Sequence, residues 1–338
     1  MKKVNFTNRV EQQQIGWKLK YVNDQRSQTW NNGKVYAHLL PKDIWDQGLW
    51  EGVRQEVLDY IRDERIQPHP MKHSLKSSWT LCINLYFIIK KSAHFQELML
   101  QFLKSRLGNG ILSVDDVNFE FALPYGDELN QSLLLGEKEG GRGVGQTSPD
   151  VALSIMTDSG PGLILIECKY TEKSFYRCSA RSTSERGDKL VNPDPQRCMQ
   201  KADLTCYRDI CHQKEWGRQY LNILELSAYG IKTLNNCPAA TSGYQLLRQQ
   251  ALAEGIARSG RYAHVYNSVA YDQNNTDLIN CLNKTGLKDW TKNWGRIFSG
   301  NAEYFSFTHQ EWVSFVRDNH VNGLSKKWLT YIHGRYQY

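Results

Sequence analysis

The stretch SPDVALSIMTDSGPGLILIECK, residues 148–169, decides the fold that we predict for this chain. The side chains of residues 151–156 alternate in character with a period of two, and residues 163–166 form a continuous apolar run. Both patterns are typical of strands in a buried sheet. The residues between them, 157–162, are turn formers. We therefore predict a β-hairpin within a buried sheet.

The open end of this hairpin brings three charged residues together. Strand residues at equal distance from the loop lie opposite each other, so Asp150 falls opposite the end of the second strand. Because side chains alternate across a strand, Glu167 and Lys169 share one face while Cys168 points to the other. The pattern predicts two carboxylates and one amine at a single edge of the sheet.

These groups suit a divalent cation and a water molecule. Mg²⁺ prefers oxygen ligands, and it usually takes only one or two carboxylates while it keeps waters and phosphate oxygens. We expect Asp150 and Glu167 to bind the metal, with the backbone carbonyl of Cys168 as a third ligand. Lys169 would orient the attacking water and stabilise developing negative charge. The residue types therefore indicate metal-dependent hydrolysis of a phosphodiester.

The spacing of Pro149-Asp150 and Glu167-x-Lys169 resembles the motif of the PD-(D/E)xK nuclease superfamily. Segments 147–150, 166–172 and 244–250 also resemble a prokaryotic restriction endonuclease-like branch. The resemblance implies an α/β fold with an αβββαβ core, in which helices flank a central mixed sheet. It also implies an endonuclease of restriction, defence or DNA processing that hydrolyses DNA with Mg²⁺ or Mn²⁺.

The other core elements are also visible in the sequence. Helical spacing of apolar residues predicts an opening helix over residues 94–107, and we expect strands over 111–123 and 262–269. Glu120 lies in the first of these strands. Because the superfamily often adds an acidic residue from this region, the resemblance makes Glu120 a candidate third metal carboxylate. The alternative is an ordinary solvated strand residue.

Residues 244–258 predict a largely buried helix that carries a polar stripe near its start. The stripe consists of Gln245, Arg248 and Gln249, spaced so that they share one face. By resemblance, these side chains would support the metal ligands or contact phosphates. The alternative is a helix end with ordinary polar residues facing solvent.

We divide the chain into four regions. They are an N-terminal helical region (1–92) packed on the core, the nuclease core (93–170 and 244–272), an insertion (171–243) and an aromatic-rich C-terminal extension (273–338). We expect the insertion to act as a lid or to contact DNA. A solvated loop is equally compatible with its first half.

The insertion holds four cysteines, Cys178, Cys198, Cys206 and Cys211. Four thiolates can bind zinc or an iron–sulfur cluster, and some exonucleases of the superfamily carry a four-cysteine cluster. Here no CxxC pair is present among the four, so we favour free thiols over a metal site.

Composition agrees with a nucleic-acid partner. The formal net charge is +7, from 42 Lys and Arg against 35 Asp and Glu, and a basic surface attracts polyanions. The start of the chain lacks an apolar signal, and the longest apolar stretch (79–89) is too short to cross a bilayer. We expect a cytoplasmic protein that binds DNA and no membrane, with a homodimer left open. A non-catalytic nucleic-acid-binding protein of the same fold and a cysteine–metal interaction module are the alternatives.

Overall fold

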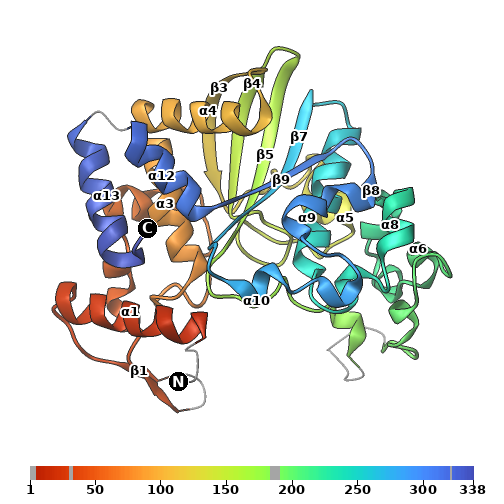
Figure 1. Cartoon of the computed structure of the whole chain (residues 1–338), viewed down its shortest axis with the longest axis horizontal. Coiled ribbons are helices and arrows are strands. Elements are labelled where there is room, and N and C mark those ends of the chain that lie inside the picture. Colours follow the sequence, from red (N-terminus) through yellow and green to blue (C-terminus); the bar gives the residue numbers. More distant parts are fainter. Residues whose placement is uncertain (1–4, 30–32, 183–190, 320–321) are drawn as a thin grey trace.

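The computed structural model describes residues 5–29, 33–182, 191–319 and 322–338. Within these residues, a five-stranded mixed sheet lies in the middle of the molecule with helices on both faces (Figure 1). In spatial order its strands are β3 (Ile111–Phe119), β4 (Val151–Thr157), β5 (Gly160–Lys169), β7 (His264–Tyr271) and β9 (Glu303–Thr308). The predicted mixed α/β architecture is therefore confirmed.

Strands β4 and β5 form the predicted hairpin. They pair antiparallel from Val151 opposite Ile166 to Thr157 opposite Gly160. Gly160 has a φ of 126°, a conformation that a residue with a Cβ rarely adopts, so the tight turn depends on glycine at this position. β3 pairs antiparallel with β4, whereas β7 runs parallel to β5 and β9 runs parallel to β7.

The elements follow the expected αβββαβ order. Helix α4 (Ala93–Leu107) precedes β3, and helix α9 (Tyr244–Arg258) connects β5 to β7. Two predicted strand boundaries were wrong. The first strand ends at Phe119 and not at residue 123, because Glu120 has a φ of 48°, which is incompatible with an extended strand. The strand after α9 begins at His264 and not at residue 262, because the residues before it form the turn that follows the helix.

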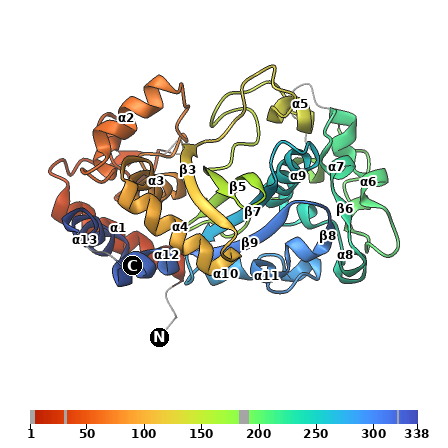
Figure 2. The same cartoon turned by 90° about the horizontal axis from the view of Figure 1, so that it is seen from above.

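Each face of the sheet packs against its own group of helices (Figure 2). One face shares an apolar core with α3 (Ser78–Lys91), α4, α12 (His309–Asn319) and α13 (Gly323–Tyr336). The other face packs on α9, and the insertion lies beyond that helix. Alternation along β4 separates the two cores, since Val151 and Leu153 belong to the first and Ala152 to the second.

The N-terminal region lies beside α13, where Nε2 of Gln14 donates a hydrogen bond to the backbone oxygen of Arg335 at 3.0 Å. Its elements are α1 (Phe6–Tyr21), β1 (Gln28–Thr29), β2 (Val35–Tyr36), η1 (Lys42–Gly48) and α2 (Arg54–Asp63). Along the chain, a short helix, α5 (Gln131–Leu135), follows β3 and precedes β4.

The insertion consists of short elements, and its residues 183–190 lie outside the described residues. The described elements are η2 (Ser179–Arg181), η3 (Arg197–Met199), α6 (Tyr207–Ile210), η4 (His212–Trp216), α7 (Tyr220–Ile223), β6 (Glu225–Leu226), α8 (Ala228–Thr233) and η5 (Pro238–Ala240). Strand β6 pairs antiparallel with β8 (Phe298–Ser299) of the C-terminal extension.

The C-terminal extension contributes to the sheet, which we did not predict. Its strand β9 follows α10 (Thr276–Ile279), η6 (Asn283–Thr285), α11 (Trp290–Asn293) and η7 (Gly295–Ile297). Helix α12 begins with a capping box: the backbone N–H of Glu311 donates to Oγ1 of Thr308 at 3.1 Å, and the Thr308 N–H donates to Oε2 of Glu311 at 2.6 Å. None of the described helices is long and apolar enough to cross a membrane.

Candidate active site

The open end of the β4–β5 hairpin holds Asp150 directly beside the end of β5. Val151 pairs with Ile166, so the next position along the ladder brings Asp150 level with Glu167. Oδ2 of Asp150 accepts a hydrogen bond from the backbone N–H of Cys168 at 2.7 Å. This bond fixes the first carboxylate on the second strand, as the hairpin pairing predicts.

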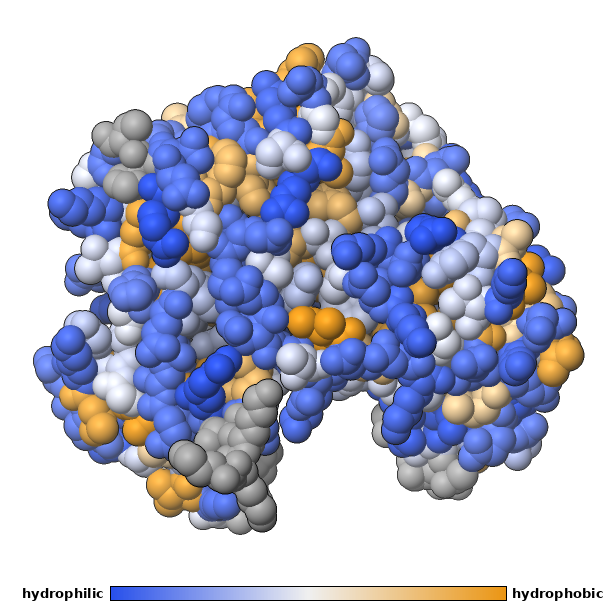
Figure 3. Space-filling model, in the orientation of Figure 1, coloured by the Kyte–Doolittle hydropathy of each residue, from blue (hydrophilic) through white to orange (hydrophobic). Residues whose placement is uncertain are grey.

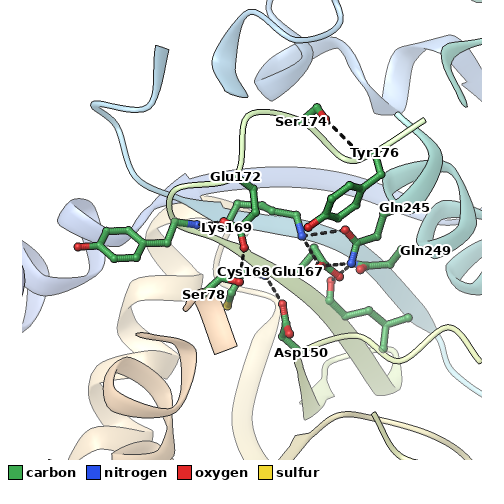
Figure 4. A network of polar contacts seen from close by, with 12 residues as sticks. Ser78, Asp150, Glu167, Cys168, Lys169, Glu172, Ser174, Tyr176, Gln245 and Gln249 are labelled. Atoms are coloured by element: carbon green, nitrogen blue, oxygen red, sulfur yellow. Dashed lines mark hydrogen bonds and ion pairs between the residues drawn. The ribbon is translucent and has the colours of Figure 1, made fainter. Parts of the chain in front are cut away.

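Glu167 and Lys169 point to the same side of β5 and meet Gln245 from the start of α9 (Figure 4). Nζ of Lys169 lies 2.7 Å from Oε1 of Glu167 and 2.8 Å from Oε1 of Gln245. Nε2 of Gln245 donates to the same Oε1 of Glu167 at 2.5 Å. The three side chains therefore form a closed ring of charge-assisted hydrogen bonds.

Lys169 is charged despite its burial. Only 3% of the residue is exposed, and burial works against an ammonium group, but the carboxylates of Glu167 and Glu172 outweigh it and raise the pKa of Lys169. A buried amine with a raised pKa keeps its proton at neutral pH. Lys169 thus presents a permanent positive charge beside the carboxylates.

The carboxylates repel one another in the absence of a cation. Desolvation, followed by the charges of Glu167 and Glu120, raises the pKa of Asp150 well above its usual value. Burial and Glu167 raise the pKa of Glu120 to about 8. A divalent cation would relieve this repulsion, so the donor set fits a hard metal ion.

The described contacts leave oxygen atoms available for such an ion. In the described part of the chain, both hydrogen bonds to the Glu167 side chain end on Oε1, and the bond to Asp150 ends on Oδ2. No three described His, Cys, Asp or Glu side chains are close enough together to enclose one ion. Asp150 and Glu167 thus each keep one carboxylate oxygen that a divalent cation could bind, and Mg²⁺ usually takes only one or two protein carboxylates.

Glu120 lies at the same site, although it is not part of a strand. Its backbone N–H donates to the backbone oxygen of Asp150 at 3.1 Å, and the residue lines the same cavity as Trp79. The residue is only 8% exposed, so the alternative of a solvated strand residue is wrong. Its role as a metal ligand stays a prediction, as does that of the Cys168 carbonyl.

The polar stripe of α9 is divided between three environments. Gln245 reaches the carboxylates, but Arg248 turns to the other side and pairs with Glu137, with Nη2 and Oε1 3.0 Å apart. Gln249 is 1% exposed, and its Nε2 donates to the Asn267 side chain at 2.8 Å. It also donates to the backbone oxygens of β5 and β7. One helical turn beyond Gln245, this side chain lies over the sheet and not over its edge.

The carboxylates face a cavity of about 530 Å³ whose far wall comes from the N-terminal region. Its lining includes Asp150, Glu167, Glu120 and Lys169, and also Tyr36, His38, His69, Lys76, Ser78, Trp79, Glu172 and Tyr176. Figure 3 shows the surface indented at the bottom of the view, between the N-terminal region and the insertion, on the side to which the hairpin opens (compare Figure 1).

Two residues that line this cavity, and that we had not predicted, fix the end of β5 through hydrogen bonds. Oε2 of Glu172 accepts the backbone N–H of Tyr170 at 2.8 Å, and the hydroxyl of Ser78 donates to the other oxygen of the same carboxylate. His309, from α12, has Nε2 3.1 Å from the backbone oxygen of Lys169. Glu172 is close to Lys169 in the sequence and could have been found there. Ser78 and His309 are far from it in the sequence, and no local pattern predicts that they lie at the site.

The predicted cysteine set is only partly brought together. Cys178, Cys198 and Cys211 line a second cavity, but the fourth cysteine of that cavity is Cys237. Cys206 is exposed on the surface and is not part of the cavity lining.

Comparison with known proteins identifies the family of the chain. Residues 11–337 match the model of a family described as Restriction Endonuclease associating with ARP. Because this match covers nearly the whole chain, the chain belongs to that family, and the predicted resemblance to restriction endonuclease-like proteins is confirmed. The searches of curated proteins and of solved structures found no match.

Proposed function

Because the chain belongs to a restriction endonuclease family, we propose that it is a PD-(D/E)xK nuclease that hydrolyses DNA with Mg²⁺ or Mn²⁺. One observation carries the proposal. Asp150, Glu167 and Lys169 converge at one sheet edge, on the floor of a large cavity. Two carboxylates and a charged amine are the groups that metal-assisted phosphodiester hydrolysis requires.

Asp150 and Glu167 would hold the metal, with Glu120 as a further carboxylate at the same cavity. A bound divalent cation would supply an activated water and would neutralise charge on the phosphate. The backbone N–H of Cys168 donates to Oδ2 of Asp150 and so keeps this carboxylate at the end of β5. The two carboxylates therefore need little rearrangement to bind.

Lys169 would act on the reacting groups themselves. Its ammonium is held by Glu167 and Gln245 at hydrogen-bond distance, so a third N–H remains to orient a water or to stabilise negative charge on the phosphate. Gln245 is a positioning residue in this scheme, because it contacts both Glu167 and Lys169. It would keep the amine and the carboxylate in fixed relative orientation.

A path for the DNA backbone is supported by a cavity that adjoins the site. This adjoining cavity shares His69 with the cavity that the carboxylates face, and its lining includes Lys42, Lys72 and Trp45. Nζ of Lys72 lies 4.6 Å from the centre of the Trp45 ring. Cationic groups interleaved with an aromatic ring suit a nucleic-acid strand that leads to the carboxylates.

The test is cleavage of plasmid and linear DNA with Mg²⁺, Mn²⁺ or EDTA by the wild type and by Lys169→Ala. Lys173→Ala is the matched control, because Lys173 lies four residues away and its side chain is 62% exposed in a surface ion pair with Asp277. We expect metal-dependent cutting by the wild type and the control, and none by Lys169→Ala.

Circular dichroism and size-exclusion profiles establish that each variant is folded. Cutting by Lys169→Ala at the wild-type rate would refute the assignment of the amine. Absence of cutting by a folded wild type, on DNA and on single-stranded or structured RNA, would instead favour a binding protein that retains the fold.

A further inference from the structure

The candidate active site is recessed in a cavity, named here the active-site cavity. Its volume of about 530 Å³ falls within the range of pockets that enclose one small ligand. Glu167 and Lys169, at its floor, are each only 3% exposed. A phosphate must therefore enter the cavity to reach them. A nucleotide can do so, whereas a double helix, whose major groove alone is about 12 Å wide, is too broad.

An aromatic side chain lies beside these recessed groups. Tyr176 lines the active-site cavity, and the centre of its ring lies 6.0 Å from Nζ of Lys169 (Figure 4). In contrast to Lys169, this tyrosine is 58% exposed. Its side chain is therefore available to a ligand that enters the cavity.

The backbone of Tyr176 has a strained conformation. Its φ of 60° lies in the left-handed region, which is an outlier for a bulky residue. Two hydrogen bonds hold it there. The N–H of Tyr176 donates to Oγ of Ser174 at 3.2 Å, and its backbone oxygen accepts the N–H of Tyr244 at 3.0 Å. Strain of this kind is concentrated at functional sites, so the exposed ring is a candidate for substrate contact.

Further rings line the walls of the active-site cavity. On the side of the N-terminal region, Tyr36 and His38 line it with their ring centres 5.6 Å apart. His69 belongs to this cavity and to the adjoining one, where the ammonium of Lys72 lies over the ring of Trp45. Rings interleaved with cations are typical of grooves for single-stranded nucleic acid, because every unpaired base offers a face for stacking.

Paired DNA would make little use of these rings. In a double helix each base is covered by its neighbours, and proteins contact the phosphates and the base edges in the grooves. An unpaired strand exposes the faces of its bases. Since a base and its phosphate are joined through one sugar, a base stacked on Tyr176 would place its phosphate close to Lys169.

We propose that the candidate active site takes a single DNA strand, and that Tyr176 stacks on the base next to the reacting phosphate. This inference rests on the proposed nuclease function and names the substrate class of the same site. Lys169 acts on the phosphate of the strand that Tyr176 holds. A duplex would have to open locally before one of its phosphates could reach Glu167.

The test is binding of fluorescent DNA of about 20 nucleotides, longer than typical single-strand sites, as a single strand and as a blunt duplex. The full chain is used in EDTA and at one salt concentration, because salt alone changes such affinities. We expect the single strand to bind at least about 10-fold more tightly than the duplex. Tyr176→Leu removes the aromatic face and should weaken single-strand binding about 10-fold, the scale of one base stack, without changing duplex binding.

Two control variants isolate the ring. Tyr176→Phe keeps the aromatic face and should bind the single strand as the wild type does. Tyr125→Leu should change neither affinity, because Tyr125 is 64% exposed but lies outside the described lining of the active-site cavity.

Binding and cutting together distinguish this inference from the proposed function. A duplex bound as tightly as the single strand, or wild-type single-strand affinity in Tyr176→Leu, would overturn the inference even if the protein cuts DNA. Tighter binding of an RNA strand of the same sequence would also overturn it. Single-strand binding that depends on Tyr176, without cutting of any DNA in Mg²⁺ or Mn²⁺, would instead overturn the nuclease and support the single-strand site.

Discussion

The candidate active site and the cavity lined by Cys178, Cys198, Cys211 and Cys237 are assembled in opposite ways. Asp150, Glu167 and Lys169 lie on two paired strands joined by a short turn, whereas the four cysteines lie on separate loops between residues 178 and 237. Strand pairing converts sequence position directly into spatial position. Loops have no such rule, so the sequence could place the charged residues of the hairpin together, but it gave no sign that Cys237, and not Cys206, lies beside the other three cysteines.

The largest effect should come from the hairpin itself. Glu167→Gln keeps the shape of the side chain but removes its charge, and we expect cleavage to fall by about 1000-fold. Lys169 would then be a buried charge with a weaker partner, so the free energy of unfolding should also fall, by about 3 kcal/mol. Plasmid cleavage rates and urea unfolding measure the two losses.

A double variant separates these losses. Glu167→Gln combined with Lys169→Met removes both charges, and we expect it to recover most of the stability and none of the activity. If either variant cleaved DNA at the wild-type rate, Glu167 would have no part in catalysis and the proposed mechanism would be wrong.

A smaller effect should come from His309, which supports the site from far along the chain. Its Nε2 donates to the backbone oxygen of Lys169, so Nδ1 accepts from the hydroxyl of Tyr86 at 3.0 Å. Burial lowers the pKa of His309 from 6.5 to about 4. At pH values between about 4 and 6.5, this residue binds more protons in the unfolded chain than in the folded chain. Its contribution to the free energy of unfolding is therefore complete above pH 6.5 and is lost as the pH falls.

The expected loss from this one residue is about 2 kcal/mol between pH 7 and pH 5. Urea unfolding of the wild type and of His309→Gln at both pH values measures it, because the difference between the two proteins cancels the contributions of the other titrating groups. An identical pH dependence for both proteins would show that His309 is not buried in its neutral form.

Gln245 and Gln249 offer a matched pair on one helix. Gln245→Leu should lower the cleavage rate about 10-fold to 100-fold with little loss of stability, because Gln245 positions Glu167 and Lys169. Gln249→Leu should instead destabilise the fold by about 1–3 kcal/mol, because its partners in the sheet lose a buried donor. The reverse pattern would mean that α9 is rotated relative to the site.

The smallest effect should come from Cys206. Its side chain is exposed, so Cys206→Ser should change the free energy of unfolding by less than about 0.5 kcal/mol. A larger loss, measured by thermal or urea unfolding, would restore Cys206 to the set of structurally important thiols.

Much of the fold could be predicted because its signals are local. Alternation in residues 151–156 and the turn at Gly160 identified the hairpin, and helical spacing identified α4 and α9. The end of β3 was predicted wrongly, because the left-handed conformation of Glu120 has no signature in a segment of strand-forming residues. Strand β9 was missed because its aromatic residues suit helix packing and sheet packing equally well.

The sequence by itself determined the hairpin, the two carboxylates and the amine at its open end, since strand pairing and side-chain alternation act over a few residues. The resemblance suggested three polar residues of α9 as their partners, but only the tertiary structure decided that Gln245 is the one that meets Glu167 and Lys169. Only the tertiary structure brought His309 to the end of β5, because α9 and α12 pack on opposite faces of the sheet. Cys237 joins the other cysteines for the same reason: contacts between distant segments depend on how the whole core packs, and no local pattern encodes that.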